Sequence, residues 1–101
     1  MKYNKLVRDK VPEIITNKGS VPITHIASDA EYGQKLNEKL QEEVTEFLKD
    51  SNEEELADIL EVIYAICDYK KIDRNKLETL RKKKAEERGG FKLKIILDEM
   101  K

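Results

Sequence analysis

The feature that most constrains this fold is a pair of long helical patterns joined by a very short turn. Apolar residues recur at helical spacing from Tyr32 to Phe47, and a second apolar set, from Leu56 to Cys67, covers a wide arc of its helix. A turn at Ser51 separates the two patterns. Because so short a connection makes consecutive helices antiparallel neighbours, we expect the two apolar faces to meet.

Carboxylates interrupt both apolar faces. At about 100° per residue, Glu43 lies in the middle of the first face, with Glu46 at its margin and Glu42 a little farther round. On the second face, Glu55 lies inside the apolar arc and Asp58 at its edge. A carboxylate on a buried face is costly unless a cation or a hydrogen-bond donor compensates it.

The acids of the two helices are expected to converge. Glu46 lies near the end of the first helix and Glu55 in the first turn of the second. The acidic pair of one helix can therefore lie beside the acidic pair of the other, at a similar level along the hairpin. Four carboxylates in a low-dielectric groove cannot all stay ionised unaided, and a divalent cation would compensate them. An all-oxygen set favours Mg²⁺, with Mn²⁺ as the alternative, over Zn²⁺. The single histidine, His25, lies outside these helices, which disfavours a di-iron site.

A structural interpretation competes with the metal site. Glu54 or Glu55 can instead complete a capping box at the start of the second helix. Acid pairs three residues apart also arise by chance in a chain with 41% charged residues. Two such pairs, each intruding on an apolar face and joined by a short turn, favour the metal site.

Composition excludes several classes of protein. A length of 101 residues fits one domain, residues 1–101. The formal net charge of −1 argues against a nucleic-acid polymer as partner. Cys67 is the lone cysteine and lies in an apolar run, which favours a reducing compartment. No uncharged run approaches the roughly 20 residues of a membrane span, and the charged N-terminus lacks an apolar signal core. We expect a cytoplasmic domain with no membrane partner.

Capping signals predict the limits of four helices. Asp9 is expected to cap a short helix over residues 10–18, and Gly19 to end it. The capping box of Ser28 and Glu31 opens a helix to about residue 50, and Ser51 or Asn52 caps the next one, to about residue 69. Asp73 caps a last helix that stops at residue 89.

Two short segments alternate in the manner of β-strands. These segments, 21–28 and 91–97, would be marginal alone, so we expect them to pair. The predicted fold is therefore mainly α, an antiparallel helical bundle with a small peripheral two-stranded β ribbon.

Basic residues supply a counterpart to the acids. Arg81, Lys84 and Arg88 share one narrow face of the last helix, in line with its apolar positions. Such a face suits a polyanion whose phosphate oxygens are bridged by a metal and neutralised by Lys and Arg. The alternative is a solvated helix end, where cations favour the dipole, and for Arg81 both interpretations stay open. Lys5 and Arg8 are further candidate phosphate contacts, or ordinary surface charges.

The acidic pattern resembles that of a known family. "EEVTE" (residues 42–46) followed by "ELAD" (residues 55–58) resembles the EExxE…ExxD signature of the MazG-like nucleotide pyrophosphohydrolases, part of the all-α NTP pyrophosphatase group. "YNKLVRDKVPEII" (residues 3–15) and "EERGGF" (residues 86–91) are similar to flanking motifs of a short phosphoribosyl-ATP pyrophosphohydrolase-like subgroup. The resemblance covers nearly the whole chain.

The resemblance implies a function. It implies Mg²⁺-dependent hydrolysis of a nucleoside triphosphate, or a related nucleotide, between the α and β phosphates, which gives a monophosphate and pyrophosphate. It also implies a homo-oligomer, a dimer or dimer of dimers, in which helices of two chains complete the core and the site. A rival from another class is a non-catalytic helical dimerisation or regulatory module on the same scaffold.

Site residues are carried over by position. Lys84 and Arg88 resemble the residues that grip phosphates, and Lys5 and Arg8 match the N-terminal block. Glu42, the first acid of the motif, or Glu46 would orient the attacking water as general base. The acids that match the metal-holding set, with one or two ions among them, are Glu43, Glu46, Glu55 and Asp58.

The chain departs from the family pattern in one respect. Only eight residues separate Glu46 from Glu55, fewer than in typical MazG proteins, so the connecting loop is tight.

Overall fold

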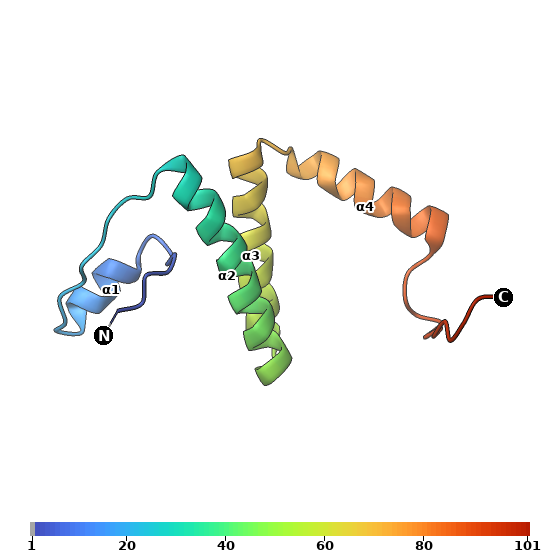
Figure 1. Cartoon of the computed structure of the whole chain (residues 1–101), viewed down its shortest axis with the longest axis horizontal. Helices are drawn as coiled ribbons and strands as arrows, with labels where there is room; N and C mark the ends of the chain where they lie inside the picture. Colours follow the sequence, from blue (N-terminus) through green and yellow to red (C-terminus); the bar gives the residue numbers. More distant parts are fainter. Residues whose placement is uncertain (1) are drawn as a thin grey trace.

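A computed structural model describes residues 2–101 and shows a helical protein (Figure 1). The mainly α prediction is confirmed, with four helices in the described chain. In chain order these are α1 (Val11–Asn17), α2 (Asp29–Asp50), α3 (Glu53–Lys70) and α4 (Arg74–Arg88).

The predicted β ribbon is wrong, because residues 2–101 contain no strand. The segments 21–28 and 91–97 lie toward opposite ends of the long axis of the molecule (Figure 1), so neither can supply a partner strand to the other. Ile23, Ile26 and Phe91 are each 97% exposed. Alternation alone does not make a strand when no neighbour completes its backbone hydrogen bonds.

Side-chain caps fix the starts of the three longer helices, as the sequence predicts. The hydroxyl of Ser28 accepts a hydrogen bond from the Glu31 backbone N–H at 3.3 Å. The side chain of Asn52, rather than Ser51, caps α3 by accepting from the Glu55 N–H at 3.0 Å. Asp73 caps α4 through the N–H of residue 75 at 2.8 Å. Each cap satisfies a backbone donor that the first turn leaves free.

The predicted cap at Asp9 is wrong. Lys10 is the N-cap of α1, and no side chain makes a capping hydrogen bond there. Its backbone already lies in the helical region (φ −92°, ψ −2°), whereas a side-chain cap requires an extended residue. Pro12 stands in the first turn, where its missing N–H costs nothing. As predicted, the helix ends just before Gly19, whose φ of +93° favours glycine.

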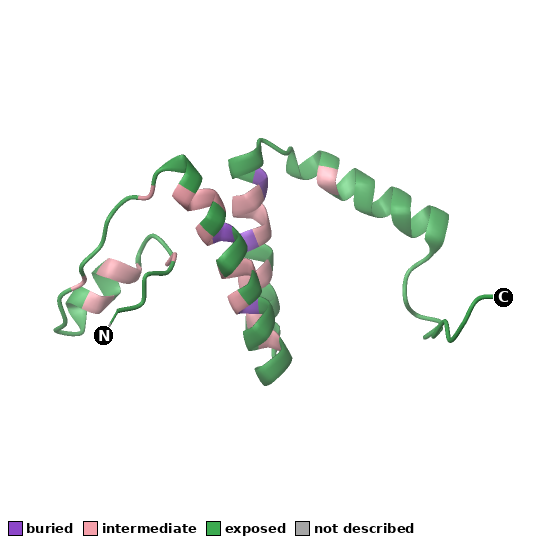
Figure 2. Ribbon diagram, viewed as in Figure 1, coloured by how far each residue is buried: buried purple, intermediate pink, exposed green. Residues whose placement is uncertain are grey.

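The core is the seam of the α2–α3 hairpin. Buried residues lie where the two helices face one another, whereas α4 is almost entirely exposed (Figure 2). Leu36 is 1% exposed and Cys67 2%, and Val62 is also buried. At the open end of the hairpin, the Tyr69 hydroxyl donates to the Asp29 carbonyl at 2.9 Å, so the helix ends are tied together.

The hairpin leaves no room for a side chain at Gly33. A Cβ built there would lie 2.5 Å from the Tyr69 hydroxyl oxygen. The ring of Tyr69 also packs edge-on against Tyr32, with centroids 5.5 Å apart. Glycine in the first part of α2 therefore serves close packing of the aromatic pair.

The molecule is much more extended than a folded monomer of its size. Its radius of gyration is 17.9 Å, against roughly 13 Å expected. Its accessible surface is 9564 Å², against roughly 5,900 Å² for a folded monomer of this mass. α4 projects away from the hairpin (Figure 1). Between α3 and α4 the chain turns at Lys71 (φ +58°), and Arg74 at the start of α4 pairs with Asp68 at 3.3 Å. Among the described helices, none has the length and apolar content needed to cross a membrane.

Leu36→Ala is expected to lower the free energy of unfolding by about 2–5 kcal/mol, because it opens a cavity in a very small core. Thr45→Ala, at an exposed position of the same helix, should change it by less than about 0.5 kcal/mol. Chemical denaturation followed by circular dichroism measures both values. Equal effects of the two substitutions would contradict the assignment of the core to the hairpin seam.

Candidate metal centre

Acidic side chains of α2 and α3 gather into two overlapping groups. In each group, the residues offer one carboxylate oxygen apiece, and these oxygens all lie within 4.8 Å of one another. The structure therefore brings together the acids predicted from sequence. One group is Glu43, Glu55 and Asp58, and the other is Glu46, Asp50 and Glu55.

Helical spacing explains why these acids meet. Residues three or four positions apart share a face, so Glu43, Glu46 and Asp50 follow one another along α2, and Glu55 and Asp58 along α3. Asp50, the last residue of α2, was not predicted from the sequence as a member of the site. Its position four residues after Glu46 is the signal that identifies it.

Burial decreases from one group to the other. Glu43 is 9% exposed and lies in the core, as its position on the apolar stripe predicts. Glu55 and Asp58 are partly buried, whereas Glu46 and Asp50 are exposed. Together the two groups form one acidic cluster, named the acidic groove below, that extends from the buried Glu43 to the exposed Glu46 and Asp50.

Mutual repulsion within the groove is visible at Glu55. Partial desolvation raises the pKa of this carboxyl group, and the carboxylates of Asp50, Asp58, Glu46 and Glu43 raise it further. Like charges this close favour either proton uptake or a bound cation. The all-oxygen donor set suits a hard divalent cation, since Mg²⁺ is usually held by one or two carboxylates and keeps water or phosphate oxygens at its other positions.

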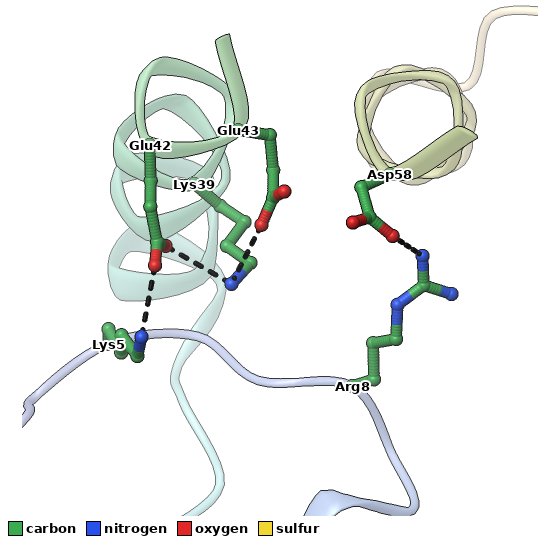
Figure 3. Close-up of polar contacts among 6 residues, drawn as sticks. All are labelled: Lys5, Arg8, Lys39, Glu42, Glu43 and Asp58. Atoms are coloured by element: carbon green, nitrogen blue, oxygen red, sulfur yellow. Dashed lines mark hydrogen bonds and ion pairs between the residues drawn. The ribbon is translucent and has the colours of Figure 1, made fainter. Parts of the chain in front are cut away.

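Basic side chains approach the acids from the N-terminal segment (Figure 3). Arg8 pairs with the Asp58 carboxylate at 2.7 Å, and Lys5 with Glu42 at 3.0 Å. Of these two predicted phosphate contacts, Arg8 thus reaches an acid of the groove and Lys5 reaches the neighbouring Glu42, and here both bind carboxylates. The chain path before α1 is irregular, so periodicity gave no means of predicting these contacts.

Lys39 is a third cation at the groove and was missed by the sequence argument. Its ammonium contacts Glu42 at 3.1 Å and Glu43 at 3.2 Å. Burial alone would lower the pKa of Lys39, but hydrogen bonds to both carboxylates raise it above its ordinary value. The signal for it is spacing, since the two acids lie three and four residues after the lysine.

Glu42 lies outside both acidic groups and is held by cations. Lys5 donates to one of its carboxylate oxygens and Lys39 to the other. Burial would raise the pKa of Glu42, but these hydrogen bonds lower it below the ordinary value. Its carboxylate is therefore ionised and engaged on both oxygens.

The basic face of α4 lies apart from the acids. Within the described chain, α4 points away from the hairpin (Figure 1), so one chain does not bring Arg81, Lys84 and Arg88 to the groove. Arg81 instead pairs with Glu78 on its own helix, and this pair raises the pKa of the guanidinium.

Comparison with known proteins gives a short segment of similarity. The chain is 48% identical over 42 residues to an uncharacterized protein of Mycolicibacterium smegmatis. The matched segment covers 42% of this chain and 43% of that protein. No family model matches the chain. No solved structure matches it either.

Glu55→Gln is expected to raise the melting temperature of the metal-free protein near neutral pH by a few degrees, because it removes one charge from the repelling group. The raised pKa of Glu55 means that the benefit of protonation is complete below the ordinary value and is lost as the pH rises through the raised value. The difference in melting temperature between variant and wild type should therefore grow as the pH rises from the ordinary pKa of a glutamate, about 4.3, towards neutral pH.

Thermal melts in EDTA across this range measure the difference. The lowered pKa of Glu42 makes stability rise with pH, opposite to the effect of Glu55. This contribution is the same in the variant and the wild type, so it cancels in the difference between them. Glu54→Gln, at an exposed position of the same helical turn, is the control. A difference that does not change with pH would contradict the repulsion within the groove.

Proposed function

We propose that this protein is a Mg²⁺-dependent nucleotide pyrophosphohydrolase that cleaves between the α and β phosphates to give a monophosphate and pyrophosphate. The observation that carries the proposal is the convergence of carboxylate oxygens from α2 and α3 within 4.8 Å of one another. The motif resemblance of the same acids supports the substrate class. Mn²⁺ is the expected substitute metal.

The metal-holding role falls to the acids of the groove. Glu43, Glu55 and Asp58 would hold one ion, and the group of Glu46, Asp50 and Glu55 offers ligands for a second. Such ions supply Lewis-acid polarisation of phosphate oxygens and lower the pKa of bound water. Lys5 and Arg8, which pair with Glu42 and Asp58 in this structure, would bind the phosphates.

The candidate general base is Glu46 rather than Glu42. Both oxygens of Glu42 accept hydrogen bonds from lysines, and its lowered pKa makes it a weak base. Glu46 is exposed at the open part of the groove, where water reaches it.

We also propose that the protein is a homo-oligomer. The accessible surface exceeds the value expected for a folded monomer by roughly 3,700 Å², whereas each partner of an obligate interface buries about 1,000–2,500 Å². One dimer interface would remove only part of this excess, which leaves room for a dimer of dimers. Exposed leucines recur one turn apart on α3, at Leu56 and Leu60, and Leu48 is exposed on α2.

A second chain would also complete the charge pattern of the site. Arg81, Lys84 and Arg88 lie far from the groove of their own chain (Figure 1), so their proposed phosphate contacts require the groove of another chain. The same exposed apolar surface supports the alternative function, a non-catalytic dimerisation or regulatory module. That alternative gives no role to the convergence of the acids. A cytoplasmic location is part of the proposal and rests on the sequence.

Glu43→Gln and Asp58→Asn are expected to lower pyrophosphate release by more than about a hundredfold, since even an outer hydrogen-bond partner of a metal ligand contributes up to that factor. The assay screens nucleoside triphosphates, deoxynucleoside triphosphates and phosphoribosyl-ATP, with Mg²⁺ and with EDTA. Glu38→Gln, at an exposed acid of α2 that pairs with Lys35, is the matched control.

The assay distinguishes the two functions. Mg²⁺-dependent release that is lost in both site variants and kept in the control supports the enzyme. Full release by Glu43→Gln or Asp58→Asn would refute the assigned site, and no release from any substrate by the wild type would favour the non-catalytic module.

The oligomer has a separate test. At tens of micromolar, light scattering is expected to give at least twice the chain mass of 11.8 kDa. Leu60→Glu should lower this mass because it places a charge on the apolar surface of α3, whereas Thr45→Glu, at an exposed polar position, should not. A wild-type mass of one chain would contradict the proposed oligomer.

A further inference from the structure

Lys39 occupies an unusual position beside the acidic groove. Its side chain is only 17% exposed, and its ammonium bridges Glu42 and Glu43, one turn farther along the same helix. The side chain of Glu43 is 11% exposed, and among the described residues Lys39 is its ion-pair partner. The lysine therefore acts on the most buried acid of the groove.

The contact uses one oxygen of Glu43 and leaves the other available. In Figure 3, Lys39 binds the Glu43 oxygen that faces away from α3, and the second oxygen points toward Asp58. Asp58 is arranged in the same manner, with Arg8 on its outer oxygen and its inner oxygen directed toward Glu43. The two free oxygens thus face one another across the seam.

Orientation of this kind matters for a small divalent cation. Mg²⁺ requires near-ideal octahedral geometry, and a glutamate side chain has several rotatable bonds that must be fixed before it can bind well. Ordering such a side chain costs conformational entropy. A hydrogen bond already made in the metal-free protein lowers that cost at the moment of binding.

We propose that Lys39 is a positioning residue of the metal centre, which holds the Glu43 carboxylate with its free oxygen directed toward Asp58. The inference rests on the proposed function, because it assigns Lys39 a role toward the same ion. Lys39 need not leave when the ion binds, since it contacts the far oxygen and its stem is partly buried. Lys39 is thus more firmly held than Arg8, whose side chain is 57% exposed.

Two simpler roles for Lys39 predict that its removal would tighten metal binding or leave it unchanged. As a competing counter-ion, it would have to be displaced, so its removal would tighten metal binding. As an ordinary ion pair within a helix, it would contribute a little to stability and leave metal affinity unchanged. Only a positioning role predicts weaker binding of the metal alone.

The experiment measures Mn²⁺ binding without nucleotide, by calorimetry or electron paramagnetic resonance. Lys39→Met, which keeps an apolar stem, should weaken the affinity about 10- to 100-fold, and Lys39→Arg should restore most of it. Lys35→Met is the matched control, because Lys35 lies one turn earlier in α2 and is also 17% exposed. Its ammonium pairs with Glu38 and donates to the Asn4 carbonyl at 2.7 Å, and neither partner is an acid of the groove. Circular dichroism in EDTA checks the fold, and Lys39→Gln replaces the methionine variant if that variant is unfolded.

The outcomes separate the two proposals. If the wild type binds Mn²⁺ and Lys39→Met binds it equally or more tightly, the positioning role is overturned and the metal site stands. If neither protein binds Mn²⁺, both proposals are overturned. Weakening by Lys35→Met to the same extent would also overturn the specific role of Lys39.

Discussion

The core of this protein buries a carboxylate, that of Glu43. Among the described residues, Glu43 shares the core of the α2–α3 hairpin with only Leu36, Val62 and Cys67. A core this small has little stabilisation to spare, and an uncompensated buried charge costs several kcal/mol. Lys39 compensates part of that cost from one side. The convergence of Glu55 and Asp58 from the other side adds repulsion, which a divalent cation would convert into attraction.

The small size of the hairpin core also explains the extended shape of the molecule. The hairpin is the one place in the described chain where two helices pack along their length, and α4 makes no comparable packing of its own (Figure 2). Leu80 on α4 and the apolar residues after it stay exposed. A chain with this much apolar surface gains stability when another copy covers it. Metal binding and association would then act on opposite faces of one hairpin, the acidic groove and the exposed leucines.

Caps and helical periodicity predicted the helices and the central acids, whereas contacts between residues far apart in the chain could not be predicted from the sequence. Caps at Ser28, Asn52 and Asp73 and helical periodicity act within a few residues, so they can be read directly. The burial of Glu43 followed from its angle on α2. The ribbon failed because strand pairing depends on a distant partner. The contact of Arg8 with Asp58 depends on the irregular path of the N-terminal segment, which no periodic pattern encodes.

The most direct test of the account is a set of thermal melts with Mg²⁺, with a nonhydrolysable nucleoside triphosphate, and with both together. A ligand that binds only the folded protein raises its melting temperature. We expect Mg²⁺ alone to raise the melting temperature, and Mg²⁺ together with the nucleotide to raise it further. Both increases should be lost in Asp58→Asn. A melting temperature that responds to neither ligand, alone or combined, would contradict the claim that the acids of α2 and α3 form a metal centre.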